Sequence, residues 1–244
     1  MAQVRQQNIV GRWCPSAGAT GFRLVDRSGR SNHGTLTSMD PASDWVVSGG
    51  KGALDFDGSN DRVSVNALSL STLDFAISFW AQQRGASAIG MPIGNTGATN
   101  SYIWFRSGNY LRFQIPAGNV EFSSVSSFTA FQHYCIFSTP STAATSTINL
   151  FVDGVSVGAA TLVAGTFTIN SIGDGYSGSS FPFPGVIDDV TIWGVGITAS
   201  EAREIYRRGR GYGIGASPHR SRPAAAGFKA YWARRQSQLI GGGV

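Results

Sequence analysis

Paired carboxylates are the first side chains in this sequence whose chemistry can be tested by spacing. Retaining glycosidases need two of them about 5–5.5 Å apart, one as nucleophile and one as acid and base. The 244 residues include three glutamates, Glu121, Glu201 and Glu204, and the last two fall on a predicted terminal helix. Asp188 and Asp189 are adjacent, so on a strand their side chains should point to opposite faces. The sequence therefore predicts no catalytic carboxylate pair and no enzymatic activity.

A lyase site would need Arg, His, Gln and Tyr side chains gathered on one face of a sheet. Gln132, His133 and Tyr134 are consecutive in a predicted strand, so they too should alternate between faces. We therefore interpret His133 as a residue of the strand and not as a catalytic base.

Oxygen-bearing side chains gather on one tight turn, residues 57–61, with the sequence Asp-Gly-Ser-Asn-Asp. Asp26, Asn32 and Asp188 could converge on this turn. Calcium takes about 6–8 oxygen ligands, a mixture of carboxylates and carbonyls, so the turn is a candidate for one structural calcium. The alternative is that these Asp and Asn side chains bind the backbone of their own turns. The sequence leaves both interpretations open.

Aromatic side chains in predicted loops and strand ends are candidates for contact with a sugar or a protein partner. The candidates are Tyr102, Trp104, Tyr176, Phe181 and Phe183. The last three belong to a Gly- and Ser-rich segment, residues 173–184, that reads as a long loop. An amphipathic ring can stack on a ligand, but it can also close the end of a β-sandwich, and that alternative stays open for each residue.

The elements that must position these residues are strands. Two-residue alternation of apolar and polar side chains recurs at residues 63–65, 75–80, 102–105, 110–115, 133–137, 147–152, 166–169 and 186–193. Ser107-Gly108-Asn109 and Asp153-Gly154 read as hairpin turns. Charged residues make up only 14% of the chain and glycine is abundant at 32 residues. The pattern predicts an all-β, two-sheet antiparallel jelly-roll sandwich.

A change in composition divides the chain near residue 206. A short helix is predicted to begin with a capping box at Thr198 and Glu201 and to end near Gly209. Residues 1–205 hold 11 Lys/Arg and 14 Asp/Glu, a net charge of 11 − 14 = −3, whereas residues 206–244 hold 8 Lys/Arg and no acid. We therefore predict a sandwich domain at 1–206 and an extended basic docking tail at 207–244. The docking residues expected in this tail are Arg207, Arg208, Arg210, Phe228, Tyr231, Trp232, Arg234 and Arg235.

The two cysteines and the chain start carry weaker signals. Cys14 and Cys135 lie in apolar, strand-like surroundings, which favours two buried thiols over a disulfide bond. The first thirteen residues have no apolar segment typical of a secretory leader, and no stretch is long and apolar enough for a membrane helix. Because the basic charge belongs to the tail, we do not interpret it as a nucleic-acid-binding surface of the domain.

Five motifs in order resemble the laminin-G-like, concanavalin A-like jelly-roll superfamily. They are residues 26–36 (DRSGRSNHGTL), 52–63 (GALDFDGSNDRV), 75–80 (FAISFW), 150–154 (LFVDG), and 185–193 (GVIDDVTIW) followed by 197–202 (ITASEA). The resemblance implies a two-sheet sandwich over residues ~10–206 and, in many members, one structural calcium. Carried over, Asp188 and the Gly58 carbonyl would be its first ligands, with Asp26 and Asp57 next. The strand of alternating acids that marks the glucanase branch is missing here.

A second, shorter resemblance concerns the closing residues 234–244 (RRQSQLIGGGV), which are similar to the C-termini of some virion proteins of tailed phages. It implies a non-enzymatic virion structural protein, a capsid decoration or tail-surface component made in the host cytoplasm. The tail would anchor it to other virion proteins or to sister subunits. The alternative is a carbohydrate-binding adhesin or receptor-binding module that recognises surface glycans. We expect neither a membrane nor a nucleic acid as partner.

Overall fold

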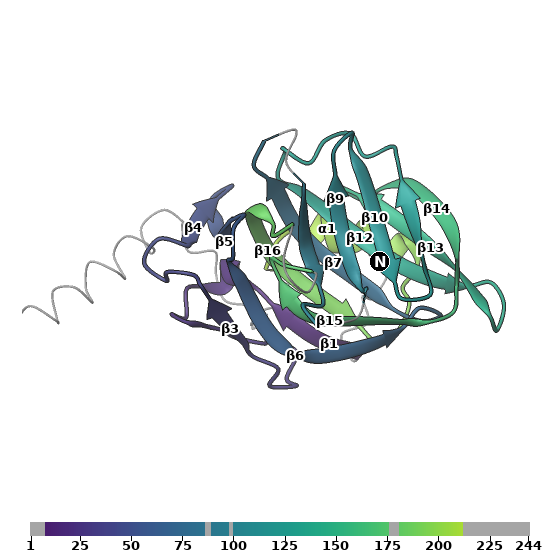
Figure 1. Ribbon diagram of the computed structural model, residues 1–244, viewed down its shortest axis with the longest axis horizontal. Coiled ribbons are helices and arrows are strands. Elements are labelled where there is room, and N and C mark those ends of the chain that lie inside the picture. Colours follow the sequence, from purple (N-terminus) through teal and green to yellow (C-terminus); the bar gives the residue numbers. More distant parts are fainter. Residues whose placement is uncertain (1–7, 86–88, 98–99, 176–180, 212–244) are drawn as a thin grey trace, which may run out of the picture.

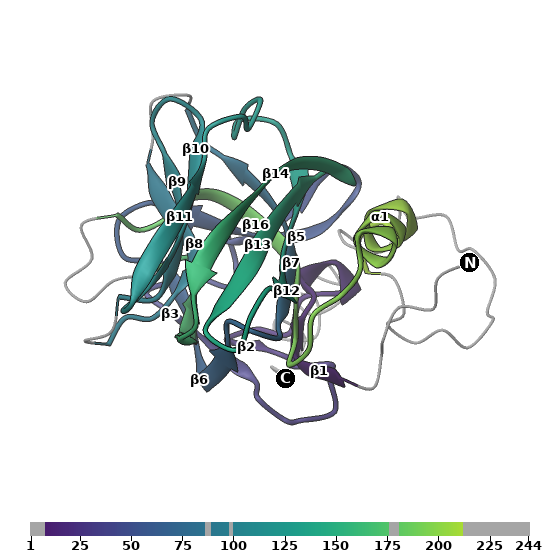
Figure 2. The same cartoon turned by 90° about the vertical axis from the view of Figure 1, so that its right-hand side faces the viewer.

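Two antiparallel β-sheets lie face to face and enclose one core (Figures 1 and 2). The computed structural model describes residues 8–85, 89–97, 100–175 and 181–211. The elements are β1 (Ile9–Trp13), a 3-10 turn (Pro15–Ala17), β2 (Arg23–Leu24), β3 (Gly34–Thr37), β4 (Trp45–Ser48), β5 (Lys51–Asp57), β6 (Arg62–Ser71), β7 (Ala76–Gln83), β8 (Gly90–Gly94), β9 (Tyr102–Arg106), β10 (Tyr110–Ile115), β11 (Gly118–Phe122), β12 (Gln132–Pro140), β13 (Thr145–Val152), β14 (Val155–Val163), β15 (Thr166–Ile172), β16 (Pro184–Trp193) and α1 (Ala199–Arg208).

The strand order shows how distant segments are joined. Sheet A runs β14-β13-β12-β7-β16-β5-β4, with β1 paired to the second half of β16, and sheet B runs β11-β10-β9-β8-β15-β6-β3-β2. Neighbours in both sheets are antiparallel, and several of them are far apart in sequence. The predicted all-β, jelly-roll sandwich with a short C-terminal helix is confirmed.

The core is a layer of aromatic rings supplied by alternate residues of both sheets. Phe79 of sheet A stacks against Phe105 of sheet B with ring centroids 6.2 Å apart, and Phe75 stacks against Phe113 at 5.3 Å. Phe105 also stacks on Phe128 at 4.2 Å. Because side chains on a strand alternate between faces, the neighbours of these rings point away from the core.

Both predicted hairpin turns are present. Asp153 and Gly154 join β13 to β14 with φ of 49° and 75°, the left-handed pair that a tight two-residue hairpin needs. Gly108 and Asn109, at φ 78° and 62°, turn β9 into β10. These turns fix the register of the strands on either side.

Helix α1 lies on the outer face of sheet A, on the opposite side of the sandwich from β9–β11 (Figure 2). The predicted capping box is formed, because Thr198 Oγ1 accepts from the Glu201 amide and a Glu201 carboxylate oxygen accepts from the Thr198 amide. A second apolar cluster, which includes Phe137, Phe151 and Trp193 of the sheet and Ala202 of the helix, forms beneath it. The predicted boundary at residue 206 falls inside α1, and the described residues continue to Gly211.

Both cysteines are buried and free, which confirms the prediction of two separate thiols. Cys14 follows β1, and Cys135 lies in β12 under the helix. Burial raises the pKa of both thiols above the ordinary range. In the part of the chain that the structure describes, no helix is long and apolar enough to span a bilayer.

The aromatic layer predicts a large effect of one truncation. Phe105→Ala should lower the free energy of unfolding by about 3–5 kcal/mol, because it removes a fully buried ring that packs on Phe79, Phe128 and Tyr134. Urea unfolding measures the change. Tyr110→Ala, at an aromatic residue that is 40% exposed, is the control and should change stability by less than about 0.5 kcal/mol. Equal losses in the two variants would contradict this account of the core.

Candidate functional site

A row of partly exposed side chains crosses the outer face of sheet B at β9, β10 and β11. Trp104 points away from the core because its neighbours Ile103 and Phe105 are buried in it. Trp104 lies directly across from Arg112 in β10, and Arg112 lies directly across from Glu121 in β11. The hairpin registers therefore place an aromatic ring, a guanidinium and a carboxylate side by side.

Two arginines frame the indole ring. The guanidinium carbons of Arg106 and Arg112 lie 4.9 and 5.4 Å from the centroid of Trp104, within the range of a cation–π interaction. Glu121 Oε1 accepts from Arg106 Nη1 at 2.5 Å and from Arg112 Nε at 2.7 Å. Partial burial raises the pKa of Glu121, but the hydrogen bonds and charges of Arg112 and Arg106 outweigh it and lower the pKa overall. The group keeps an excess of positive charge.

The structure places four of the five predicted contact aromatics. Phe181 packs on Trp104 with centroids 5.0 Å apart, and Tyr102 meets the same ring edge-on at 6.1 Å, although Tyr102 itself is buried. Phe183 is 0% exposed and belongs to the core, so its prediction as a ligand contact is wrong. The Gly-rich segment before it suggested an exposed loop, but the Phe183 amide is bonded to the Gly173 carbonyl and holds the ring inward. Tyr176 lies outside the described residues.

The residues that sequence reasoning missed here are Arg106, Arg112 and Glu121. The position of Arg112 could have been predicted from the Ser107-Gly108-Asn109 turn, because a hairpin closed there sets Arg112 opposite Trp104. No comparable signal indicates the position of Phe181, which comes from a segment more than seventy residues away. We name the set Trp104, Arg106, Arg112, Glu121 and Phe181 the Trp104 face.

The predicted calcium residues do not form one group. Asp57 Oδ1 accepts from the amide of Ser59 in its own turn. The carboxylate of Asp26 accepts four hydrogen bonds, from the amides of Arg12, Ser28 and Asn32 and from the Ser28 hydroxyl. Burial raises the pKa of Asp26, but these bonds lower it below the ordinary value overall. Among the residues that the structure describes, no three His, Cys, Asp or Glu side chains lie together as a metal site.

Asp188 and Asp189 do not point to opposite faces, so that prediction is wrong. Asp189 has φ of 46° and the pairing of β16 with β7 shifts register between Asp188 and Thr191, so the alternation is interrupted. Asp189 accepts from the Gly211 amide at 2.7 Å, and Asp188 accepts from Arg210 Nε at 2.6 Å. The two carboxylates therefore hold two consecutive residues of the segment after α1.

Three of the predicted docking arginines belong to the body. Arg207 and Arg208 pair with Glu204 within helix α1. Arg210 is 8% exposed and its guanidinium is hydrogen-bonded to Asp188 of the same chain. The prediction that it docks on another molecule is therefore wrong. Phe228, Tyr231, Trp232, Arg234 and Arg235 lie outside the described residues.

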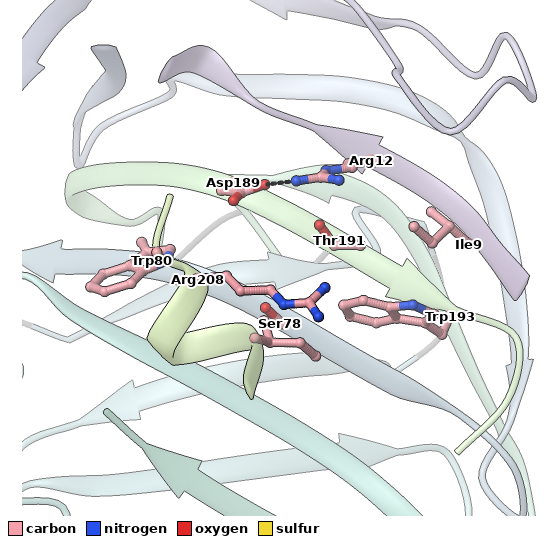
Figure 3. A pocket seen from close by; sticks show the side chains of 10 residues that line it. Ile9, Arg12, Ser78, Trp80, Asp189, Thr191, Trp193 and Arg208 are labelled. Carbon is pink, nitrogen blue, oxygen red and sulfur yellow. Dashed lines mark hydrogen bonds and ion pairs between the residues drawn. The ribbon is translucent and has the colours of Figure 1, made fainter. Parts of the chain in front are cut away.

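A pocket opens between α1 and the outer face of sheet A (Figure 3). Arg12 and Asp189 line one side, where their side chains form an ion pair at 3.4 Å, and Trp80, Trp193 and Arg208 line the rest. Burial and the charge of Asp188 raise the pKa of Asp189 despite the Arg12 guanidinium. With a volume of about 30 Å³ the pocket has room for one or two water molecules but none for a sugar ring. The Trp104 face is therefore the better candidate for ligand binding.

Near this pocket His133 is fully buried, packed against Trp80 at 5.2 Å and bonded through Nε2 to Ser78 Oγ at 2.9 Å. Burial lowers the pKa of His133 to about 3 from 6.5, because it disfavours the charged imidazolium. The folded chain therefore binds fewer protons than the unfolded chain between these values, and stability is lost as the pH falls through that window.

Because of His133, we predict that the free energy of unfolding falls by about 1.4 kcal/mol for each pH unit below about pH 6.5. In His133→Gln this contribution is absent, so the stability of the variant should fall less steeply between about pH 6 and pH 4. Urea unfolding at several pH values measures both slopes. Parallel curves for the wild type and the variant would show that His133 does not titrate in this way.

Comparisons with known proteins agree with this architecture. The family model Laminin_G_3, described as concanavalin A-like lectin/glucanases superfamily, matches residues 57–203, more than half of the chain. No curated protein sequence matches. Domain 4 of AbnA, a GH43 extracellular arabinanase from Geobacillus stearothermophilus, solved with arabinotriose, is 14% identical with a TM-score of 0.60, covering 82% of this chain and 98% of that one.

Two further solved structures share the fold over part of their length. The receptor binding domain of botulinum neurotoxin type G is 15% identical with a TM-score of 0.55, and the match covers 82% of this chain and 51% of that one. Trypanosoma rangeli sialidase, solved with sialic acid, is 12% identical with a TM-score of 0.57, covering 85% of this chain and 34% of that one. At these identities the likeness shows the fold alone, and the family match shows that the chain belongs to the laminin-G-like branch of the concanavalin A-like lectin/glucanases superfamily.

Proposed function

We propose that this chain is a non-enzymatic glycan-binding module and that the Trp104 face is its binding site. The observation that carries the proposal is the pairing of a half-buried indole with two guanidinium groups on the outer face of sheet B. The only helix in the described residues lies against the other sheet, so it does not cover this face. An aromatic ring with polar donors around it suits a sugar, which has an apolar face and hydroxyl groups at its rim.

The charge of the face favours an acidic sugar. Arg112 uses two of its nitrogens and Arg106 uses one to bind Glu121. A guanidinium carries more N–H donors than these contacts need, so both arginines retain donors for a second acceptor. Two cations and one carboxylate leave one positive charge over the group, which matches one carboxylate or sulfate of a ligand.

Some of the similar structures are of proteins that bind ligands, and each ligand belongs to its own protein. Among them are an arabinanase domain with bound arabinotriose, a toxin receptor binding domain and a sialidase with bound sialic acid. The arabinanase domain is matched over 98% of its length, so it supports the proposal that a sandwich of this shape can bind a sugar. The identity of the ligand rests on the residues of this chain.

A glycan array of neutral, carboxylated and sulfated sugars tests the proposal. We expect an acidic glycan to bind, and we expect Trp104→Ala and Arg112→Gln each to weaken binding by about tenfold or more, because each removes a contact worth about 1–3 kcal/mol. Phe22→Ala is the control, since Phe22 is a 66% exposed aromatic beside β2, at the far end of the same sheet. Binding that Trp104→Ala leaves unchanged would refute this site, and binding of neutral sugars only would refute the acidic preference.

A second proposed role is that of a virion structural subunit, a capsid decoration or tail-surface component whose C-terminal tail anchors it to virion proteins or sister subunits. Two observations favour it. All acidic residues lie before residue 206, and eight basic residues follow it. Hydrogen bonds from Arg210 and Gly211 to Asp188 and Asp189 hold the last described residues, which precede the basic segment, against the sandwich. The two roles are compatible, because the Trp104 face lies on sheet B, whereas Arg210 and Gly211 are bonded to strand β16 of sheet A.

Two truncations separate anchoring from folding. Deletion of residues 212–244 should leave the melting temperature of the sandwich nearly unchanged and abolish its incorporation into the assembly. Deletion of residues 207–244 also removes Arg210, so it should lower the melting temperature because Asp188 is left buried without its partner. Thermal unfolding and co-sedimentation with the assembled particle measure the two effects. Normal incorporation of the shorter deletion would contradict the anchoring role.

A further inference from the structure

The guanidinium of Arg210 lies inside a ring of oxygen atoms at one end of the sandwich. Its Nε donates to Asp188 Oδ2 at 2.6 Å, and its Nη1 donates to the Ser48 carbonyl at 2.5 Å. Its Nη2 donates to the carbonyls of Gly52 at 2.7 Å and Lys51 at 3.3 Å. One carboxylate and three backbone carbonyls therefore surround a single positive charge.

This oxygen set is the kind that a hard divalent cation uses, because calcium takes carboxylate and backbone carbonyl oxygens together. Asp188 is 0% exposed, so its charge must be compensated within the fold. The oxygen atoms come from two separate parts of the chain, the β4–β5 hairpin and strand β16, and the cation comes from the residue two places after α1. A cation at its centre holds these parts together.

The guanidinium is held from other directions as well. Its central carbon lies 4.5 Å from the centroid of the Phe131 ring. The Lys51 ammonium donates to the backbone carbonyl of Arg210 at 2.6 Å, so the main chain at this residue is fixed too. Arg210 is therefore placed as firmly as a core residue, although it follows the last helix.

The calcium that the family resemblance implies at Asp188 does not fit these residues as they stand. Asp188 Oδ2 is bonded to Arg210, and Asp188 Oδ1 accepts from the Ser16 amide at 2.9 Å. We propose that the ring is a cation site whose resident cation is the Arg210 side chain, and that a calcium-sized divalent ion binds there only after this side chain is removed. In the unmodified chain, the covalently attached charge of Arg210 thus takes the place of a metal ion.

The β4–β5 turn allows the ring to adapt to a smaller cation. Gly49 and Gly50 have φ of 56° and 76°, so the turn is made of two residues without side chains between two of the carbonyl ligands. The oxygens now lie 2.5–3.3 Å from three different nitrogens of the guanidinium, so the carbonyls must move inward to reach calcium–oxygen distances of about 2.3–2.6 Å from one central ion. Water would complete the coordination, as it does at many calcium sites.

Thermal unfolding of the full-length protein tests the proposal, with calcium chloride at about 5 mM against sodium chloride of equal ionic strength. The wild-type melting temperature should respond neither to calcium nor to EDTA. Arg210→Ala should melt at a lower temperature, and calcium should raise its melting temperature by about 5 °C with saturation. A wild type that EDTA destabilises, or an Arg210→Ala protein that calcium does not stabilise, would overturn the proposal.

Two controls assign the calcium response to this ring. The double variant Arg210→Ala/Asp188→Asn lacks the carboxylate ligand and should not respond to calcium. Arg84→Ala removes a partly exposed arginine that pairs with Asp55 elsewhere, and it should not respond either. An equal response in any of these controls would show that calcium acts at another place. If Arg210→Ala yields no folded protein, Arg210→Gln takes its place, and a calcium-independent melting temperature there overturns the proposal in the same way.

Discussion

Two carboxylates buried on the last strand constrain the rest of this molecule. Strand β16 lies inside sheet A, where it pairs with β1, β5 and β7, so any charge on it must be compensated by the chain itself. Asp189 pairs with Arg12 of the first strand and Asp188 pairs with Arg210 beyond the helix. The requirement for neutrality thus joins the first strand, the middle of sheet A and the residues after α1, segments that no local signal connects.

The sequence predicted what depends on neighbouring residues. Alternation indicated the strands, Asp153-Gly154 indicated a hairpin, and Thr198 with Glu201 indicated the start of α1, since each depends on contacts within a few residues. Two expectations failed for one physical reason, because long-range contacts override local composition. Phe183 follows a Gly- and Ser-rich segment and yet lies in the core, and Arg210 belongs to a basic stretch and yet is buried.

The site was predictable in part. Trp104 stood out as an aromatic residue next to a turn, and the turn itself implies that Arg112 lies opposite. The left-handed backbone at Asp189 could not be foreseen, because an aspartate on a strand normally keeps the alternation. That single residue decides whether the two carboxylates diverge or meet the same segment, and so it decides whether the residues after α1 belong to the body.

The two outer faces of the sandwich differ in whether the α-helix covers them. Sheet A is closed by α1, with His133, Trp80 and Tyr206 packed in the interface. Sheet B keeps the Trp104 face partly exposed at β9–β11.

The two buried cysteines are built-in probes of local opening in this protein. The thiolate is the species that attacks alkylating reagents, and burial with a raised pKa keeps it scarce at Cys14 and Cys135 while the chain is folded. Labelling therefore proceeds only through open states. Cys14 lies beside the Asp188–Asp189 pair and Cys135 lies under α1. The two labelling rates therefore compare opening around the Asp188–Asp189 pair with dissociation of α1 from sheet A in a single unmodified chain.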